Sequence, residues 1–156
     1  NGAVLSLALQ TDGRLLAGGK FTRFAGQVRT NLARLNADGT LDNTFDSGAN
    51  SVVYALALQT DGQILAGGAF TALAGQRLSR LGQLTNTDPA YDTLYGGGDY
   101  LFWERGGAGP EVSRATFQYW TQGVGWEALG AGIYTGGGWE LALLSTRGSR
   151  ANWGAV

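Results

Sequence analysis

The chain has 156 residues, a formal net charge of −1, 15% charged residues and 44% hydrophobic residues. Its hydrophobic residues follow regular patterns, which excludes a disordered chain even though 27 residues are glycine. The charge balance offers no basic stripe of the kind that binds nucleic acid, and no apolar run of about 18 residues could span a membrane.

Three residue types, Cys, His and Met, are missing altogether. Without Cys or His the chain has no thiol nucleophile, no Ser-His-Asp triad and no His-ligated zinc site, so we expect no enzyme activity of those classes and no cofactor. Because the sequence has no Met, we expect it to be a segment of a longer or processed chain. The surface carries a single lysine, Lys20, which favours an extracellular location.

A block of sequence occurs twice. Leu7–Gly13, which reads LALQTDG, returns as Leu56–Gly62, and Leu16–Gly19 returns as Leu65–Gly68, in both cases 49 positions later and without a gap. A repeat of this length is typical of repeat architectures such as solenoids and propellers. We therefore expect one β repeat over residues 1–49 and a second over residues 50–97.

Each repeat begins with an alternating segment. In the first, Leu5, Leu7 and Leu9 alternate with Ser6 and Ala8. The second repeats the pattern, with Tyr54, Leu56 and Leu58 against Ala55 and Ala57. Alternation with a period of two predicts a strand, and large residues on one face with small residues on the other predict burial on both sides. We expect close packing between units at the small residues Ser6, Ala8, Ala55 and Ala57.

The rest of each repeat predicts two hairpins, hence four short antiparallel strands. Thr11–Gly13 is an Asp-Gly turn and Arg14–Ala17 is the return strand, which Gly18 and Gly19 end or bend at a bulge or a close backbone approach. Leu32–Leu35 leads into the turn-forming cluster Asn36–Gly39.

All five Trp residues fall within residues 98–156. Five aromatic-rich segments separated by glycines predict a small antiparallel β-sandwich or barrel there: residues 100–104, 115–121, 126–129, 133–134 and 139–144. Phe117 and Tyr119 predict a core face, as do Trp139, Leu141 and Leu143. No helical pattern occurs in the sequence.

Over residues 1–97 the chain resembles the delta-sixty repeat family. The resemblance rests on Leu7–Gly13, on Leu15–Gly19 with Phe21-Thr22, and on Leu32–Asp42 with Thr44-Phe45. It implies propeller-like repeats of large bacterial proteins that are secreted or surface-attached, with no catalytic residues to carry over. Residues 114–144 also resemble the tail module that follows such repeats, with Thr116-Phe117, Trp126 and Gly138-Trp139 as markers.

Two groups of residues suggest chemistry. Asn36, Asp38, Thr40 and Asp42 alternate around Gly39 like an oxygen-rich calcium loop, but they lack the distant bidentate Glu, and a hairpin turn is the favoured interpretation. A glycosidase would need two carboxylates across a cleft. The candidates are Glu104, Glu111, Glu127 and Glu140, although alternation with Trp126 and Trp139 predicts solvent-facing positions for the last two.

Alternation turns Trp120 away from Phe117 and Tyr119, so Trp120 is the candidate platform for a sugar ring. A closed propeller needs about 4 to 8 blades, and this sequence holds two. We therefore predict a non-catalytic structural protein at a bacterial cell surface, which associates with itself or with flanking repeats through open sheet faces and edges, into filaments if the contact does not close. The alternative is an adhesion module that binds a glycan or a protein.

Overall fold

The computed structural model describes residues 2–86, 88–97, 99–143 and 152–155, and no helix occurs among them. Its strands are β1 (Gly2–Leu9), β2 (Leu15–Phe21), β3 (Arg23–Phe24), β4 (Gln27–Val28), β5 (Leu32–Leu35), β6 (Val53–Leu58), β7 (Ile64–Gly68), β8 (Leu81–Leu84), β9 (Tyr91–Gly96), β10 (Tyr100–Gly106), β11 (Thr116–Thr121), β12 (Gly125–Ala131), β13 (Ile133–Tyr134), β14 (Gly138–Ala142) and β15 (Asn152–Ala155). The predicted all-β class is confirmed.

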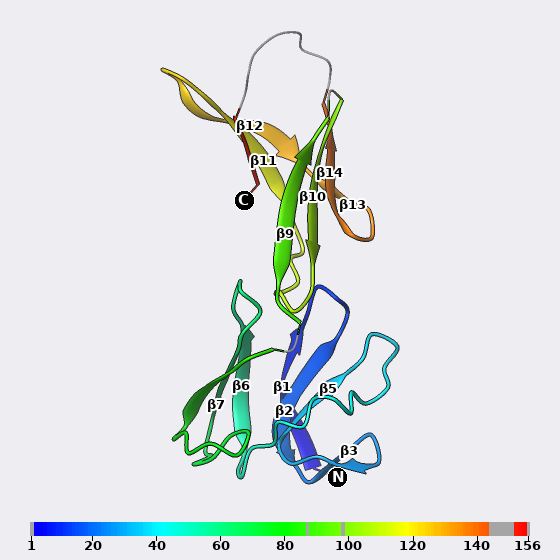
Figure 1. The fold of residues 1–156 in the computed structure, drawn as a ribbon, viewed down its shortest axis with the longest axis vertical. Coiled ribbons are helices and arrows are strands. Elements are labelled where there is room, and N and C mark those ends of the chain that lie inside the picture. The colour runs from blue at the N-terminus through cyan, green and yellow to red at the C-terminus, as the bar shows by residue number, and fades with distance from the viewer. Residues whose placement is uncertain (1, 87, 98, 144–151, 156) are drawn as a thin grey trace. The chain divides into compact units, whose positions relative to one another are not determined.

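The chain forms two compact units. The first contains Asn1–Tyr91 together with Gly107–Glu111, and the second contains Asp92–Gly106 together with Val112–Val156. Figure 1 shows the strands of each unit in chain colours. The division into repeats at 1–49 and 50–97 and a module at 98–156 stays a prediction.

The first unit contains one antiparallel sheet from each repeat, in the orders β1-β2-β5 and β6-β7-β8. Each sheet therefore has three strands where four were expected. In the first repeat a single β-bridge between Leu35 and Leu41 stands in place of the expected fourth strand. The reason is local: Asp42 accepts hydrogen bonds from the amide and the hydroxyl of Thr44, so the chain turns instead of extending the ladder.

The repeat extends to the backbone. Ala25 and Ala74 lie 49 positions apart and have φ angles of 47° and 48°. In both copies the register shifts at a bulge, between Val4 and Ser6 and between Val53 and Ala55. A side chain at the facing glycines Gly19 and Gly68 would collide with backbone oxygens of the bulged strand. The predicted bulge or close approach is confirmed, and β2 runs on through its two glycines.

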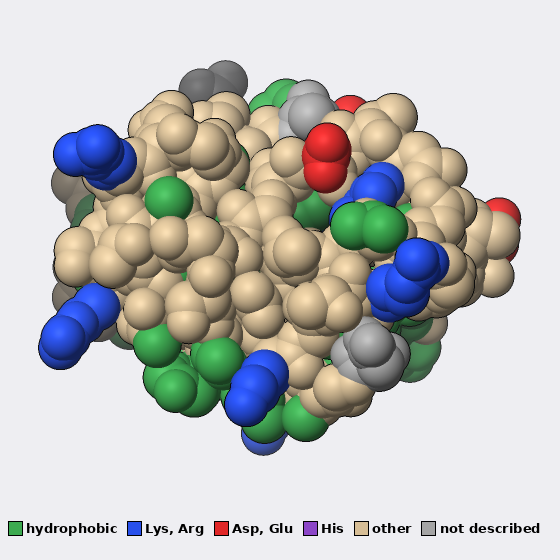
Figure 2. Space-filling model, turned by 90° about the horizontal axis from the view of Figure 1, so that it is seen from below, with side chains coloured by type: hydrophobic (Ala, Val, Ile, Leu, Met, Phe, Trp, Pro, Cys, Tyr) green, Lys and Arg blue, Asp and Glu red, His purple; other side chains and the backbone are tan. Residues whose placement is uncertain are grey.

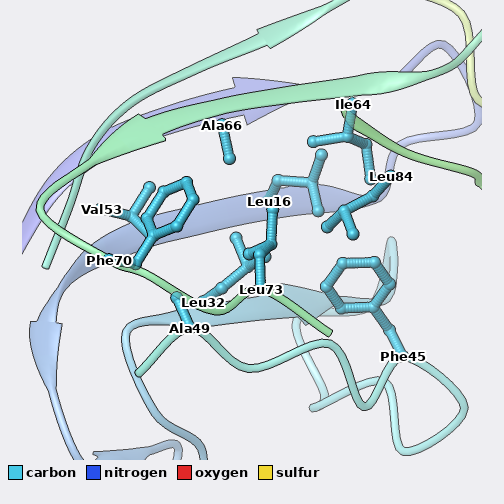
Figure 3. Packing of buried hydrophobic residues seen from close by; sticks show 10 residues of the cluster. All are labelled: Leu16, Leu32, Phe45, Ala49, Val53, Ile64, Ala66, Phe70, Leu73 and Leu84. Atoms are coloured by element: carbon cyan, nitrogen blue, oxygen red, sulfur yellow. The ribbon is translucent and has the colours of Figure 1, made fainter. Parts of the chain in front are cut away.

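The core of the first unit lies between the two repeat sheets (Figure 3). It comprises Leu16, Leu32, Phe45, Ala49, Val53, Ile64, Ala66, Phe70, Leu73 and Leu84. The first four come from repeat 1 and the others from repeat 2, and the figure shows their side chains pointing toward one another. The two sheets therefore stack face to face and share one core.

Two expectations about this core were wrong. Leu5, Leu7 and Leu9 of β1 are exposed, so β1 is not buried on both sides. Tyr54 is also exposed, and Val53 takes the inward place expected for it. The bulge is the reason for Leu5 and Tyr54, which it leaves outside the regular register. Leu7 and Leu9 follow the bulge and are exposed because no described sheet packs on them.

A short segment of later sequence completes the first unit. The carbonyl of Gly109 accepts hydrogen bonds from the amide and the hydroxyl of Thr11, and Gln10 forms a β-bridge with Pro110. Glu111 donates its amide to the carbonyl of Leu9. The end of β1 is thus covered by residues 107–111, while the middle of this edge strand has β2 as its one neighbour.

The second unit contains the sheets β13-β14-β10-β9 and β12-β11-β15. Its core holds Leu101, Ala115, Phe117 and Trp139, with Leu141 and Leu143 packed against them. The predicted core face of Phe117 and the stripe of Trp139, Leu141 and Leu143 are confirmed. Strand β9 was missed, because the repeat period assigned its residues to repeat 2. Residue 144, the end of one predicted strand, lies outside the described residues.

Candidate assembly faces and aromatic surface

Each repeat sheet has two faces, which the strand registers define because residues directly opposite one another point to the same side. One face carries the small residues of the first strand, and we call it the alanine face. In repeat 1 it comprises Ser6, Ala8, Leu16, Gly18, Leu32 and Arg34, and in repeat 2 the equivalent Ala55, Ala57, Leu65, Gly67, Leu81 and Gln83. Every pair of equivalents is 49 positions apart.

The opposite side is the leucine face. In repeat 1 it comprises Val4, Leu7, Leu9, Leu15, Ala17 and Leu35, and in repeat 2 the equivalent Val53, Leu56, Leu58, Ile64, Ala66 and Leu84. Leu5 and Tyr54 sit within the bulges, outside both registers. Each chain therefore has two alanine faces and two leucine faces.

Within the first unit, the alanine face of repeat 1 packs on the leucine face of repeat 2. The hydroxyl oxygen of Ser6 accepts a hydrogen bond of 2.9 Å from the amide of Leu56. A Cβ added at Gly18 would lie 2.7 Å from Cγ1 of Val53, so only a residue without a side chain permits this approach. The predicted packing residues Ser6 and Ala8 line this contact, which lies inside one chain.

The other two faces are open over part or all of their area. On the leucine face of repeat 1 the half next to β5 is covered within the chain, because Ala33 is fully buried in a cluster with Phe21 and Leu41, and the edge formed by β1 is open. On the leucine face of repeat 1, Leu7 is 59% exposed and Leu9 is 48% exposed, whereas their equivalents Leu56 and Leu58 pack against the shared core. On the alanine face of repeat 2, Ala55 and Ala57 are exposed. Leu81 there is 65% exposed, against 1% for its equivalent Leu32. The same residue types are thus covered in one copy and uncovered in the other.

A buried ion pair of repeat 1, Arg34 with Asp42, is hydrogen-bonded to Asn86 of repeat 2. The Arg34 guanidinium is fully buried and donates from Nε to Asp42 at 2.8 Å and from Nη1 to the Asn86 side-chain oxygen at 2.5 Å. Its guanidinium carbon also lies 4.7 Å from the centre of the Phe45 ring. Asn86 in turn donates to the carbonyl of Gly62. Sequence reasoning missed this group, since an Arg on an alternating strand gives no sign of which face it occupies.

The pKa of Asp42 is lowered to about 2. Burial alone would raise it, but the hydrogen bonds from Thr44 and from Arg34, together with the guanidinium charge, outweigh that effect. Asp42 therefore holds its negative charge opposite Arg34 at all but strongly acidic pH.

The suspected calcium loop is a hairpin turn. Asp38 accepts hydrogen bonds from the amide and the hydroxyl of Thr40, and Asn36 donates its side-chain amide to the same hydroxyl. These contacts lower the pKa of the Asp38 carboxyl, first of all through the Thr40 hydroxyl. Asp42 faces Arg34. Within residues 2–86, 88–97, 99–143 and 152–155, no cluster of three His, Cys, Asp or Glu suits a metal ion.

Trp120 lies on the solvent side of β11, 39% exposed. Directly opposite it on β12 is Trp126, which is 61% exposed. Trp126 and Glu127 were expected to face the core and the solvent respectively, but Trp126 points outward and Glu127 is half-buried on the other face, accepting a hydrogen bond of 2.7 Å from the Tyr119 hydroxyl. Register decides these faces, because Trp126 must share the side of its partner.

The glutamates do not gather at one place. Glu127 belongs to the sheet β12-β11-β15, whereas Glu104 and Glu140 belong to the four-stranded sheet. Glu104 accepts a hydrogen bond of 2.8 Å from the Tyr95 hydroxyl, and Glu140 is exposed as predicted. Glu111 belongs to the first unit.

One open hollow in the first unit is lined by Gly2, Lys20, Phe21, Thr22, Asn31, Ser51 and Val52. The Asn31 side chain is hydrogen-bonded to the backbone there: its oxygen accepts from the Phe21 amide and its nitrogen donates to the Ala49 carbonyl.

In the view of Figure 2 the Lys and Arg side chains stand apart from one another and form no continuous patch. The described residues include no helix that is long and apolar enough to cross a membrane.

Residues 10–45 and 59–87 match the model of a family described as a domain of unknown function (DUF5122) beta-propeller. The repeats are of the propeller type. The two matched stretches begin at Gln10 and Gln59, which are equivalent residues, so each stretch follows one repeat. Neither the curated proteins nor the solved structures contained a match.

Proposed function

We propose that this chain is a non-catalytic structural module that associates with copies of itself, or with flanking repeats of a longer chain, at a bacterial cell surface. The observation that carries the proposal is the open leucine face of repeat 1. Its residues have the chemistry of a core, and their equivalents in repeat 2 are core residues of the same chain. Exposed apolar surface of this kind marks interaction sites in soluble proteins.

The internal repeat supports the same function. A closed propeller has roughly 4 to 8 blades, and within the described residues each end of the pair of repeats exposes apolar side chains of a sheet face. We assign the repeats to the delta-sixty type on the motifs of residues 1–97. The chain has no His or Cys, and its candidate glutamates belong to separate sheets. Both observations favour a non-catalytic role.

Sedimentation velocity over a wide range of protein concentration tests the proposal, with electron microscopy to look for filaments. We expect the weight-average mass to rise with concentration. A monomer that persists at high concentration, with no change in mass, would refute self-association.

A second candidate function is glycan binding at Trp120 and Trp126. These side chains lie opposite one another on neighbouring strands and are both exposed, which gives an aromatic surface on which sugar rings can stack. A glycan array separates this function from assembly. We expect bound glycans to be lost from Trp120→Ala and from Trp126→Ala but not from Tyr134→Ala, an exposed aromatic on another sheet. Binding that survives both Trp substitutions would remove this candidate.

A further inference from the structure

We propose that the open leucine face of repeat 1 binds the open alanine face of repeat 2 of a second copy of this chain, in the arrangement that already joins the two repeats within one chain. The inference rests on the proposed self-association. It adds which two faces meet and that the contact runs head-to-tail from one copy to the next. Among the described residues, the β1 edge of one leucine face and one alanine face are free, so each copy would offer one contact of each kind.

The contact inside the first unit serves as the template. There the side chains of one alanine face interdigitate with those of one leucine face around a common core (Figure 3). The free alanine face carries Leu65 and Leu81 where the packed one carries Leu16 and Leu32, and the free leucine face carries Leu7 and Leu9 where the packed one carries Leu56 and Leu58. At these positions the two free faces carry the same residue types that pack together in the template, and the part of the leucine face that a second copy would cover is the edge formed by β1, since Phe21 and Leu41 cover the other half.

A glycine strengthens the argument. Gly18 must lack a side chain because Val53 and Leu56 of the neighbouring repeat lie against it. Its equivalent, Gly67, has no such neighbour: a Cβ there would meet atoms no closer than 3.9 Å, and its φ angle is not positive. Glycine in a strand interior costs stability. None of the described residues therefore requires glycine at position 67, whereas a second copy packed on it would.

Two differences from the template concern polar groups. Gln83 replaces the buried Arg34, and its amide donates to Gln59 at 2.5 Å. A neutral amide pair is cheaper to remove from water than an ion pair, so covering this face is easier. Ala55 replaces Ser6 and cannot accept the hydrogen bond that Ser6 accepts from Leu56. We therefore expect the contact between chains to be weaker than the contact within one chain.

This contact is heterologous, because it joins two different surfaces. Such contacts form a ring if the rotation closes and a filament if it does not. A ring with about 4 to 8 blades would contain about two to four chains. In both forms every chain uses its leucine face for one neighbour and its alanine face for the other.

Two variants that each block one face test this directly. Leu7→Asp places a charge on the leucine face, and Ala57→Arg places a long charged side chain on the alanine face. Both positions are exposed in the single chain, so far-UV circular dichroism should show both variants folded. Leu5→Asp is the matched control, since its equivalent Tyr54 stays 58% exposed in the template even though the neighbouring leucine face is covered.

We expect each blocked variant alone to stay monomeric at concentrations about 100-fold above the wild-type midpoint, because burying an unpaired charge prevents the contact. Mixed together, they should form a 1:1 dimer and nothing larger, since one free face of each kind remains. Leu5→Asp should assemble like the wild type.

Other outcomes would overturn the inference in different ways. If one blocked variant still associates with itself, or if the folded pair fails to combine, the contact is not between these two faces, although self-association stands. If the wild type is monomeric throughout, the proposed function fails together with the inference.

Discussion

The substitution of alanine for the equivalent glycines Gly18 and Gly67 should have opposite effects on the stability of the first unit. At Gly18 the new Cβ would lie 2.7 Å from Cγ1 of Val53 and 3.2 Å from Cδ1 of Leu56, in a fully packed core. Val has a stiff χ1 angle and cannot swing away easily. Overpacking of this kind costs about 1–3 kcal/mol, and the smaller entropy of the unfolded chain with Ala returns about 0.4–1 kcal/mol.

We therefore expect Gly18→Ala to lower the free energy of unfolding by about 1–2 kcal/mol. At Gly67 the added Cβ makes only ordinary contacts, with the nearest atom at 3.9 Å. Gly67→Ala should raise the free energy of unfolding by about 0.4–1 kcal/mol for the same reason of unfolded-chain entropy. The two substitutions are the same and lie at equivalent positions of the two repeats. The difference between their changes in unfolding free energy therefore reports that one sheet face is covered and the other is not.

Urea unfolding of the full chain, at a dilution where it is monomeric, measures both effects. Far-UV circular dichroism reports the unfolding of the first unit along with that of the second. If both substitutions changed stability by the same amount and sign, the account of one covered and one open face would be wrong.

Three further predictions concern the ion pair and the assembly contact. Arg34→Met should cost about 3–5 kcal/mol by leaving Asp42 buried without its partner, while Gln83→Met at the exposed equivalent should stay within about 0.5 kcal/mol; urea unfolding compares them. Because the pKa of Asp42 is about 2 against an ordinary value near 3.9, its contribution of roughly 2–3 kcal/mol is present above about pH 4 and disappears as the pH falls toward 2; unfolding of Asp42→Asn across this range should show a flatter acid decline, and an unchanged slope would contradict the assignment. Ala55→Ser should restore the hydrogen bond that Ser6 makes in the template and tighten assembly by about 0.5–1.5 kcal/mol, which sedimentation measures, with Ala55→Val as the variant that should weaken it.

The sequence by itself determined the elements that depend on local chemistry. Leu32–Leu35 and Ile133–Tyr134 were placed to the residue, and most other strands to within a few positions. Asp-Gly turns and alternating apolar residues are recognised from a few neighbours in the chain, and the repeat supplied the first hairpin of residues 1–97 twice. The turn at Asn36–Gly39 was recognised for the same reason, since its hydrogen bonds close within the loop.

Which faces are buried was decided only by the tertiary structure. Leu7 and Leu56 are the same residue in the same local sequence, yet one is exposed and the other packs against the core, because only one of them has a sheet stacked upon it. Trp126 turned outward because its strand register is set by Trp120, and the buried pair of Arg34 and Asp42 is completed by Asn86, 52 positions from Arg34. A repeat cannot distinguish its copies by local sequence. Their difference arises from position in the stack, and the two faces left open by that position are where we expect another chain to bind.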